Sequence, residues 1–123
     1  MAIRTILLVD DDPDIRHIGV LCLTRLGGWE VFEASSGQEC LERAASLQPD
    51  LVLLDVMMPG LDGPSTLAEL RKRPITASIP VIFMTARVQD HEVAAYMDDG
   101  AIGVVAKPFD PIQLPAQIRE IIG

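Results

Sequence analysis

Five short apolar runs alternate along the chain with five amphipathic stretches, and this alternation limits the possible folds more than any other feature. Three of the runs, ILLV, LVLL and VIFM, are almost continuously apolar, which is typical of strands covered on both faces of a parallel sheet. The run WEVFE is more mixed and suits an edge strand. The five predicted strands are Thr5–Val9, Trp29–Ala34, Leu51–Asp55, Pro80–Met84 and Gly103–Ala106.

The stretches between these runs carry signals for helix starts and ends. Pro13 suits the first turn of a helix that starts near Asp12, and Gly27-Gly28 closes this helix. Ser36 and Glu39 match a capping box at the start of a second helix. The remaining helices are predicted to start at Pro64, to run from the cap Asp90 through Met97 to Gly100, and to open at Asp110-Pro111, where Pro115 is expected to weaken the last helix.

Strict alternation of strands and helices with short loops predicts an α/β fold with right-handed crossovers and helices on both faces of a parallel sheet. A chain of 123 residues has the usual size of one domain, so we predict a single domain over residues 1–123. Ligands of such sheets bind beyond the carboxyl ends of the strands. This edge is therefore the place to look for functional residues.

Composition excludes several function classes. A net charge of −8 argues against direct binding to nucleic acid or to anionic lipid. No apolar run approaches the length needed to span a membrane, and no signal-peptide pattern opens the chain, so we predict a cytoplasmic protein. Cys22 and Cys40 lack metal-ligand spacing and are expected to be buried, reduced thiols.

Polar residues follow four of the five predicted strands. Asp10-Asp11 follows the first strand, Asp55 ends the third, Thr85 follows the fourth and Lys107 follows the fifth. These residues should converge at one edge of the sheet, whereas the second strand contributes nothing comparable. Like charges about 4 Å apart cost on the order of 4 kcal/mol per pair near a protein surface. A carboxylate cluster without Cys or His predicts a compensating hard cation such as Mg²⁺.

The same set could carry out phosphoryl chemistry. One carboxylate could attack a phosphoryl group and form an aspartyl-phosphate. The lysine and a metal ion would neutralise the phosphoryl oxygens, and the threonine hydroxyl would donate a hydrogen bond to one of them. The residues alone leave the nucleophile open among Asp10, Asp11 and Asp55. Asp12 and Asp14 are better interpreted as acidic residues that favour a helix N-terminus.

Four segments of the chain resemble the signature segments of a bacterial response-regulator receiver domain, the CheY-like family. These segments are LLVDDDPDIR, PDLVLLDVMMPGLDG, VIFMTA and AKPFD, and they occur in the family's order across essentially the whole chain. The resemblance implies a flavodoxin-like, doubly wound (βα)5 fold with strand order 2-1-3-4-5. It also implies that the peptide bond between Lys107 and Pro108 is cis, which proline permits.

The resemblance also assigns roles to the site residues. Asp55 would be the phospho-acceptor, Thr85 the switch hydroxyl and Lys107 the cation that pairs with the phosphoryl group. The implied Mg²⁺ ligands are Asp11 directly, Asp10 through a bound water or by orienting the ion, Asp55, and the backbone carbonyl of Met57. The implied phosphodonor is a sensor histidine kinase or a histidine phosphotransfer protein, and phosphorylation would switch binding to a downstream partner. The domain would catalyse only its own phosphorylation and dephosphorylation, so it would not be a classical enzyme.

Val104 departs from the family pattern, because receivers commonly carry Tyr or Phe three residues before the lysine. Val104 has no ring to couple to the threonine in the family's usual way, so a phosphate sink, a relay and a constitutive interaction module are alternatives to the switch. A phosphatase of the haloacid-dehalogenase type is disfavoured, because Met57 occupies the position of its second aspartate. Arg87, two residues past Thr85, lies where the family's residue affects hydrolysis of the phosphoryl group. His17 and His91 have no partner at metal-ligand spacing, so no special role is predicted for them.

Overall fold

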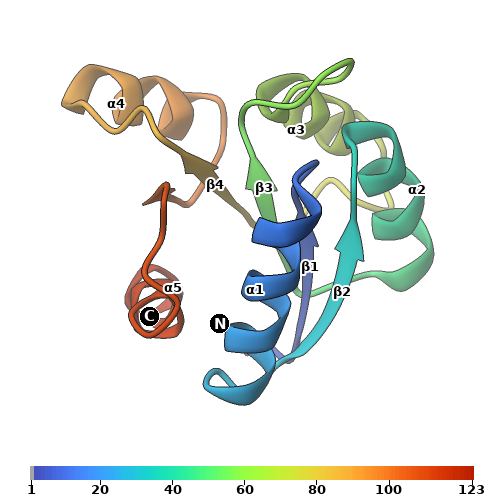
Figure 1. Ribbon diagram of the computed structural model, residues 1–123. Helices are drawn as coiled ribbons and strands as arrows, with labels where there is room; N and C mark the ends of the chain where they lie inside the picture. Colours follow the sequence, from blue (N-terminus) through green and yellow to red (C-terminus); the bar gives the residue numbers. More distant parts are fainter. Residues whose placement is uncertain (1) are drawn as a thin grey trace.

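The computed structural model describes residues 2–123 and contains a five-stranded parallel sheet with helices on both faces (Figure 1). The strand order is β2-β1-β3-β4-β5, so the predicted fold class and order are confirmed. In chain order the elements are β1 Thr5–Val9, α1 Pro13–Arg25, β2 Glu30–Ala34, α2 Gly37–Leu47, β3 Leu51–Asp55, α3 Gly63–Lys72, β4 Val81–Thr85, α4 Asp90–Asp98, β5 Gly103–Ala106 and α5 Leu114–Ile122.

Helix α1 starts as its sequence predicts. The Asp12 carboxylate accepts hydrogen bonds from the backbone N–H groups of Asp14 and Ile15, and Pro13 occupies the first turn. At α2 the capping box is only half formed. The Ser36 hydroxyl accepts from the Glu39 N–H, but the Glu39 carboxylate accepts from Ser35 rather than from Ser36.

Two other helix starts differ from the prediction. The N-cap of α4 is Gln89, which forms a reciprocal capping box with Glu92, so Asp90 is the first helical residue and not the cap. Helix α5 begins at Leu114 instead of Asp110-Pro111, and residues 111–113 form a turn in which the Asp110 carbonyl accepts from the N–H groups of Gln113 and Leu114. Pro115 therefore lies at the helix start, where no helical hydrogen bond is lost, so the structural cause expected to weaken the helix is absent.

Apolar side chains form one core on each face of the sheet. Every residue of β3 and β4 is buried, as their continuous apolar runs predict. Cys40 belongs to the core that includes α2 and α3, whereas Cys22 belongs to the core that includes α1 and α5. Burial raises the pKa of the Cys40 thiol to about 12 and raises the pKa of Cys22 as well. Both cysteines are free thiols, as expected.

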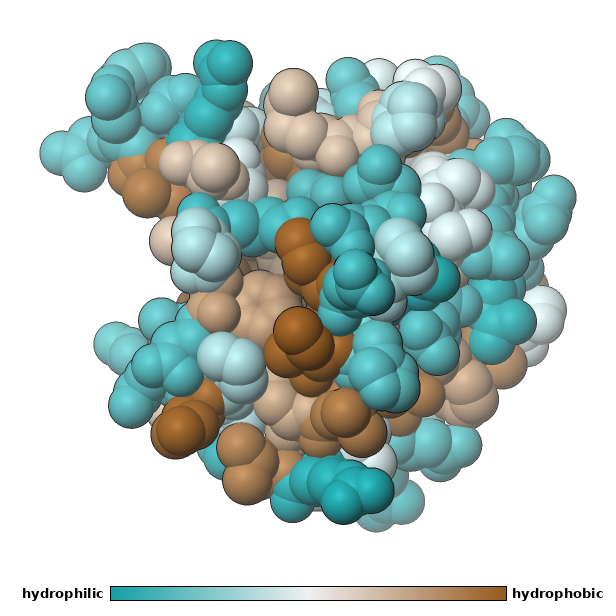
Figure 2. Space-filling view, in the orientation of Figure 1, coloured by the Kyte–Doolittle hydropathy of each residue, from teal (hydrophilic) through white to brown (hydrophobic). Residues whose placement is uncertain are grey.

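A groove opens between α4 and α5. It has a volume of about 610 Å³ and is lined mainly by apolar side chains, among them Val88, Val93, Val104 and Ile121. In the space-filling view, the hollow lies at the left of the molecule between the lobes that carry α4 and α5 (Figure 2). Within residues 2–123, no helix combines the length and the apolar character needed to cross a bilayer. The cis bond between Lys107 and Pro108 is present as predicted.

Candidate functional site

The residues predicted at the strand ends line one pocket at the carboxyl edge of the sheet. This pocket has a volume of about 310 Å³. It brings together side chains that are separated by up to 97 positions in the sequence. The predicted site residues that line it are Asp10, Asp11, Asp55, Met57, Thr85 and Lys107. Parallel strands cause this convergence, because all their carboxyl ends meet at the same edge.

Every polar group of Asp10, in the side chain and in the backbone, has a hydrogen-bond partner. Its side chain is 1% exposed; Oδ1 accepts from the Asp12 N–H at 2.9 Å, and Oδ2 accepts from Lys107 Nζ at 2.8 Å. Its backbone N–H donates to the Ala34 carbonyl of β2, and its own carbonyl accepts from Arg16 Nη1. A buried carboxylate needs such partners, because burial without them would disfavour its charge. The Asp10 side chain therefore has a single defined direction.

Asp55 shares the lysine with Asp10. Asp55 is 3% exposed, its Oδ2 lies 3.2 Å from Lys107 Nζ, and its Oδ1 accepts from the Met57 N–H at 3.3 Å. Burial, followed by the negative charge of Asp10, raises the pKa of Asp55 to about 6, although Lys107 and the Met57 N–H oppose this shift. Asp55 is therefore mainly ionised at pH 7, but at an electrostatic cost that a cation in the pocket would reduce.

The pKa of Lys107 is also shifted. Burial acts to lower this pKa, but the hydrogen bonds and negative charges of Asp10 and Asp55 together outweigh burial, and the pKa is raised. Lys107 is thus a permanent cation between two carboxylates.

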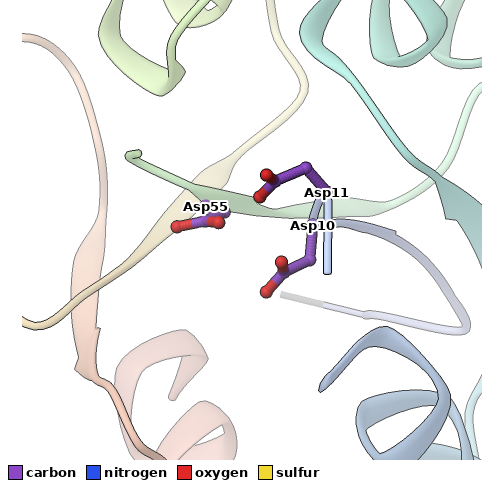
Figure 3. A group of neighbouring side chains, drawn as sticks. All are labelled: Asp10, Asp11 and Asp55. Atoms are coloured by element: carbon purple, nitrogen blue, oxygen red, sulfur yellow. The ribbon is translucent and has the colours of Figure 1, made fainter. Parts of the chain in front are cut away.

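Asp11 differs from both neighbouring carboxylates. It is exposed, and no hydrogen-bond donor to its carboxylate lies among the residues that the structure describes. In Figure 3 the side chains of Asp10 and Asp11 leave opposite sides of the chain, while Asp55 approaches from the adjacent strand. One oxygen atom from each of the three carboxylates lies within 4.8 Å of the others. Three carboxylates against one ammonium make a hard-oxygen, negatively charged set that fits a divalent ion such as Mg²⁺.

Thr85 ends β4 and is connected to Lys107 through the backbone. Its side chain is 1% exposed, its Oγ1 accepts from the Arg87 N–H at 3.0 Å, and its carbonyl accepts from the Lys107 N–H at 2.8 Å. The hydroxyl therefore lines the pocket and at the same time fixes the first residues of the loop that leads to α4.

Sequence reasoning missed the contribution of Arg16 and Glu33. Arg16 binds the Asp10 carbonyl at 2.8 Å and the Glu33 carboxylate at 3.1 Å, so β2 supports the site indirectly, although it supplies no residue to the pocket lining, as predicted. Arg16 belongs to the segment DPDIR, but nothing in its position predicts a partner on another strand. The signal that could have found it is a charged residue in the first turns of a helix that follows a carboxylate pair.

The comparison that decides the family is a match to the model described as the response regulator receiver domain, which covers residues 6–119. The chain belongs to the response regulator receiver domain family. Its pocket of Asp10, Asp11 and Asp55 is typical of the phospho-accepting aspartate site of receivers, and receivers are not classical enzymes, as predicted from the sequence.

The chain is also similar in sequence and in structure to known regulators. The chain is 33% identical over 119 residues to the phosphate regulon transcriptional regulatory protein PhoB of Pseudomonas aeruginosa, covering 97% of this chain and 52% of that protein. It is 42% identical over 117 residues to the probable transcriptional regulator ycf27 of Porphyra purpurea, covering 95% and 46%. The crystallised chemotaxis response regulator CheY4 of Vibrio cholerae has a TM-score of 0.89 at 27% identity, with 98% of this chain and 99% of that chain covered.

The receiver spans about half the length of the curated relatives that it matches. Those relatives are transcriptional regulators by name, whereas CheY4 matches along almost its whole length. The receiver fold therefore occurs both within longer regulators and as nearly the entire chain of a chemotaxis protein.

Proposed function

We propose that Asp55 is the phospho-acceptor of this receiver and that residues 1–123 act as one phosphorylation-dependent binding module. The observation that carries the proposal is the position of Lys107 Nζ, 2.8 Å from Asp10 and 3.2 Å from Asp55 in the acidic pocket. A lysine in this place can pair with Asp55 before transfer and with a phosphoryl oxygen afterwards.

The proposed step is an in-line displacement on phosphorus. An oxygen of Asp55 forms the new O–P bond while the P–N bond of a phosphohistidine breaks, and the electron pair of that bond stays on the histidine nitrogen. Asp55 must be ionised to attack, and with a pKa of about 6 it is mainly ionised at pH 7. The Thr85 hydroxyl would donate to a phosphoryl oxygen, and Lys107 would neutralise its charge.

Hydrogen-bond partners distinguish Asp11 from Asp10 as proposed metal ligands, whereas Asp55 and the Met57 carbonyl are proposed from the family resemblance. Asp11 has an exposed carboxylate and would bind Mg²⁺ directly, together with Asp55 and the Met57 carbonyl. Both oxygens of Asp10 already accept hydrogen bonds, which favours a role through a bound water or in orienting the ion. Bound Mg²⁺ would supply positive charge beside the phosphoryl oxygens. The donor set contains only oxygen, in agreement with this choice of ion.

The proposed partners are a sensor histidine kinase or a histidine phosphotransfer protein as donor and a downstream protein as reader. A cytoplasmic location and the absence of direct nucleic-acid binding by this domain belong to the same proposal. Both are supported by the acidic composition and by the family.

A second candidate function is a phosphate sink or relay with weak switching. The observation that favours it is Val104, a half-buried residue that lines the groove between α4 and α5 without filling it. A β-branched aliphatic side chain has few rotamers and cannot move a ring between exposed and buried positions. Equal partner affinity before and after phosphorylation would favour the sink, the relay or a constitutive module over the switch.

The test is intact-mass spectrometry after incubation with acetyl phosphate, with and without Mg²⁺. We expect the wild type to gain one phosphoryl group only when Mg²⁺ is present, and Asp55→Asn to gain none. Asp98→Asn removes an exposed carboxylate at the end of α4 and should behave as the wild type. If no adduct accumulates, beryllofluoride binding is measured on the same samples. Absence of both, or an adduct that persists in Asp55→Asn, contradicts the proposal.

A further inference from the structure

Arg16 joins the end of β1 to the edge strand β2 through one guanidinium group. Its Nη1 donates to the Asp10 carbonyl at 2.8 Å, and its Nε lies 3.1 Å from the Glu33 carboxylate. The Arg16 side chain is largely buried, with 19% exposed, whereas the Glu33 side chain is 48% exposed. The planar guanidinium can donate in two fixed directions at once, which a lysine ammonium on a flexible stem cannot reproduce.

The Asp10 carbonyl, which accepts the hydrogen bond from Arg16, lies just after the end of β1. β1 ends at Val9, and the last backbone bond toward β2 is the one from the Asp10 N–H to the Ala34 carbonyl. The next carbonyl, that of Asp10, accepts from Arg16. This carbonyl belongs to the planar peptide that links Asp10 to Asp11, so holding it restricts the backbone from which both carboxylates extend.

Asp11 depends most on this restraint. The Asp10 side chain is oriented by Lys107 and by the Asp12 N–H, but the Asp11 carboxylate has no donor among the described residues. The backbone is therefore the part of Asp11 that other groups hold in place, and it fixes the point from which the carboxylate reaches the ion. A metal ligand that lacks its own partner needs support from the surrounding shell, because the geometry of a metal site is maintained by groups that do not touch the ion.

We infer that Arg16 is a positioning residue for the metal-binding carboxylates and that Glu33 orients Arg16. This inference rests on the proposed function, since it concerns the same Mg²⁺ site. It gives β2, which supplies no residue to the pocket lining, a role in the chemistry. In a simpler role, the ion pair between Arg16 and Glu33 would only stabilise the packing of α1 against β2. Loss of the pair would then lower folding stability alone, whereas loss of a positioning residue would also weaken Mg²⁺ binding.

The experiment compares Arg16→Lys and Glu33→Gln with the wild type and with the control Arg25→Lys, an exposed arginine at the far end of the same helix. Mg²⁺ affinity is measured by calorimetry and by the shifts of backbone amide NMR signals, and the thermal midpoint is recorded without metal. We expect Arg16→Lys to weaken Mg²⁺ binding about 10-fold or more, as loss of supporting groups does at other metal sites. Glu33→Gln should weaken it less, and Arg25→Lys should leave it unchanged.

Each outcome decides the matter. Mg²⁺ affinity equal to that of the wild type in Arg16→Lys, with only the thermal midpoint lowered, overturns the inference and leaves a structural ion pair. If Arg16→Lys does not fold, Glu33→Gln decides, and an unchanged affinity there overturns the inference. If the wild type itself binds no Mg²⁺, the proposed metal site fails first and the inference fails with it. That result differs from failure of the inference alone, in which the wild type binds normally.

Discussion

Helices α3 and α4 have similar lengths but very different packing. Helix α3 buries Gly63, Thr66, Leu67 and Leu70, whereas α4 buries none of its residues and reaches the core mainly through Tyr96, whose ring meets Phe83 edge to face at 5.4 Å. The carboxylates of the site extend from the ends of β1 and β3, which lie in the well-packed part of the sheet. Thr85, by contrast, leads into the loop before α4.

This difference shows how the fold can hold the site residues on well-packed strands while a loosely packed helix, α4, remains able to move in response to phosphorylation. Phosphoryl transfer requires side chains held in place, and β1 and β3 are buried almost throughout. A response requires an element that can move at low free-energy cost, and such elements have few buried apolar contacts. α4 meets this description, and Thr85 connects it to the pocket through the hydrogen bond from the Arg87 N–H.

The largest expected effect is on the free energy of unfolding, when one apolar side chain is truncated in α3 and one in α4. Leu67→Ala in α3 removes a fully buried side chain and should lower the free energy of unfolding by about 2–5 kcal/mol. Val93→Ala in α4 removes a half-buried side chain and should lower it by only about 0.5 kcal/mol. Urea unfolding followed by circular dichroism measures both. Equal losses in the two variants would break the comparison.

The second prediction concerns the free-energy cost of keeping Asp55 ionised at the end of the buried strand β3. Because the pKa of Asp55 rises from 3.8 to about 6 on folding, the folded state binds more protons between these pH values, and stability falls as pH rises through this window. Without metal at pH 7, Asp55→Asn should therefore be more stable than the wild type by up to about 3 kcal/mol.

Urea unfolding in EDTA at pH 7 and near pH 4 measures this effect, with Asp98→Asn as the control for losing one negative charge. The advantage of Asp55→Asn should shrink at the lower pH, where Asp55 is protonated in the folded wild type. Mg²⁺ should also reduce it, because an ion that binds the folded wild type stabilises that state. An Asp55→Asn variant less stable than the wild type at pH 7 would show that the pairing with Lys107 dominates.

The smallest expected effect is that of Thr85→Val. The substitution removes the acceptor of the Arg87 N–H and should cost about 1 kcal/mol of stability. Asp55 should still accept a phosphoryl group, but the response of α4 should weaken. Hydrogen exchange of the α4 amides with and without beryllofluoride tests this, with the exposed Thr24→Val as control. An unchanged response in Thr85→Val would place the signal on another path.

Much of the site could be predicted because it depends on strand ends. The apolar runs mark where β1, β3 and β4 stop, and the residues that follow are Asp10, Asp55 and Thr85 at the same edge of any parallel sheet. The helix starts were harder to predict. Asp110-Pro111 is equally suited to a turn and to a helix N-terminus, and the turn is formed here because the Asp110 carbonyl accepts from Gln113 and Leu114.

The sequence by itself determined the strand and helix order, the two-sided burial of the sheet and the set of polar residues at its edge, because hydrophobic periodicity and strand ends are local properties. The tertiary structure alone decided that Lys107 pairs with both Asp10 and Asp55, that Asp11 stays exposed, and that Arg16 reaches Glu33 on β2. It also decided that α4 buries nothing. These features depend on contacts between residues far apart in the chain, and such contacts arise only when the elements pack.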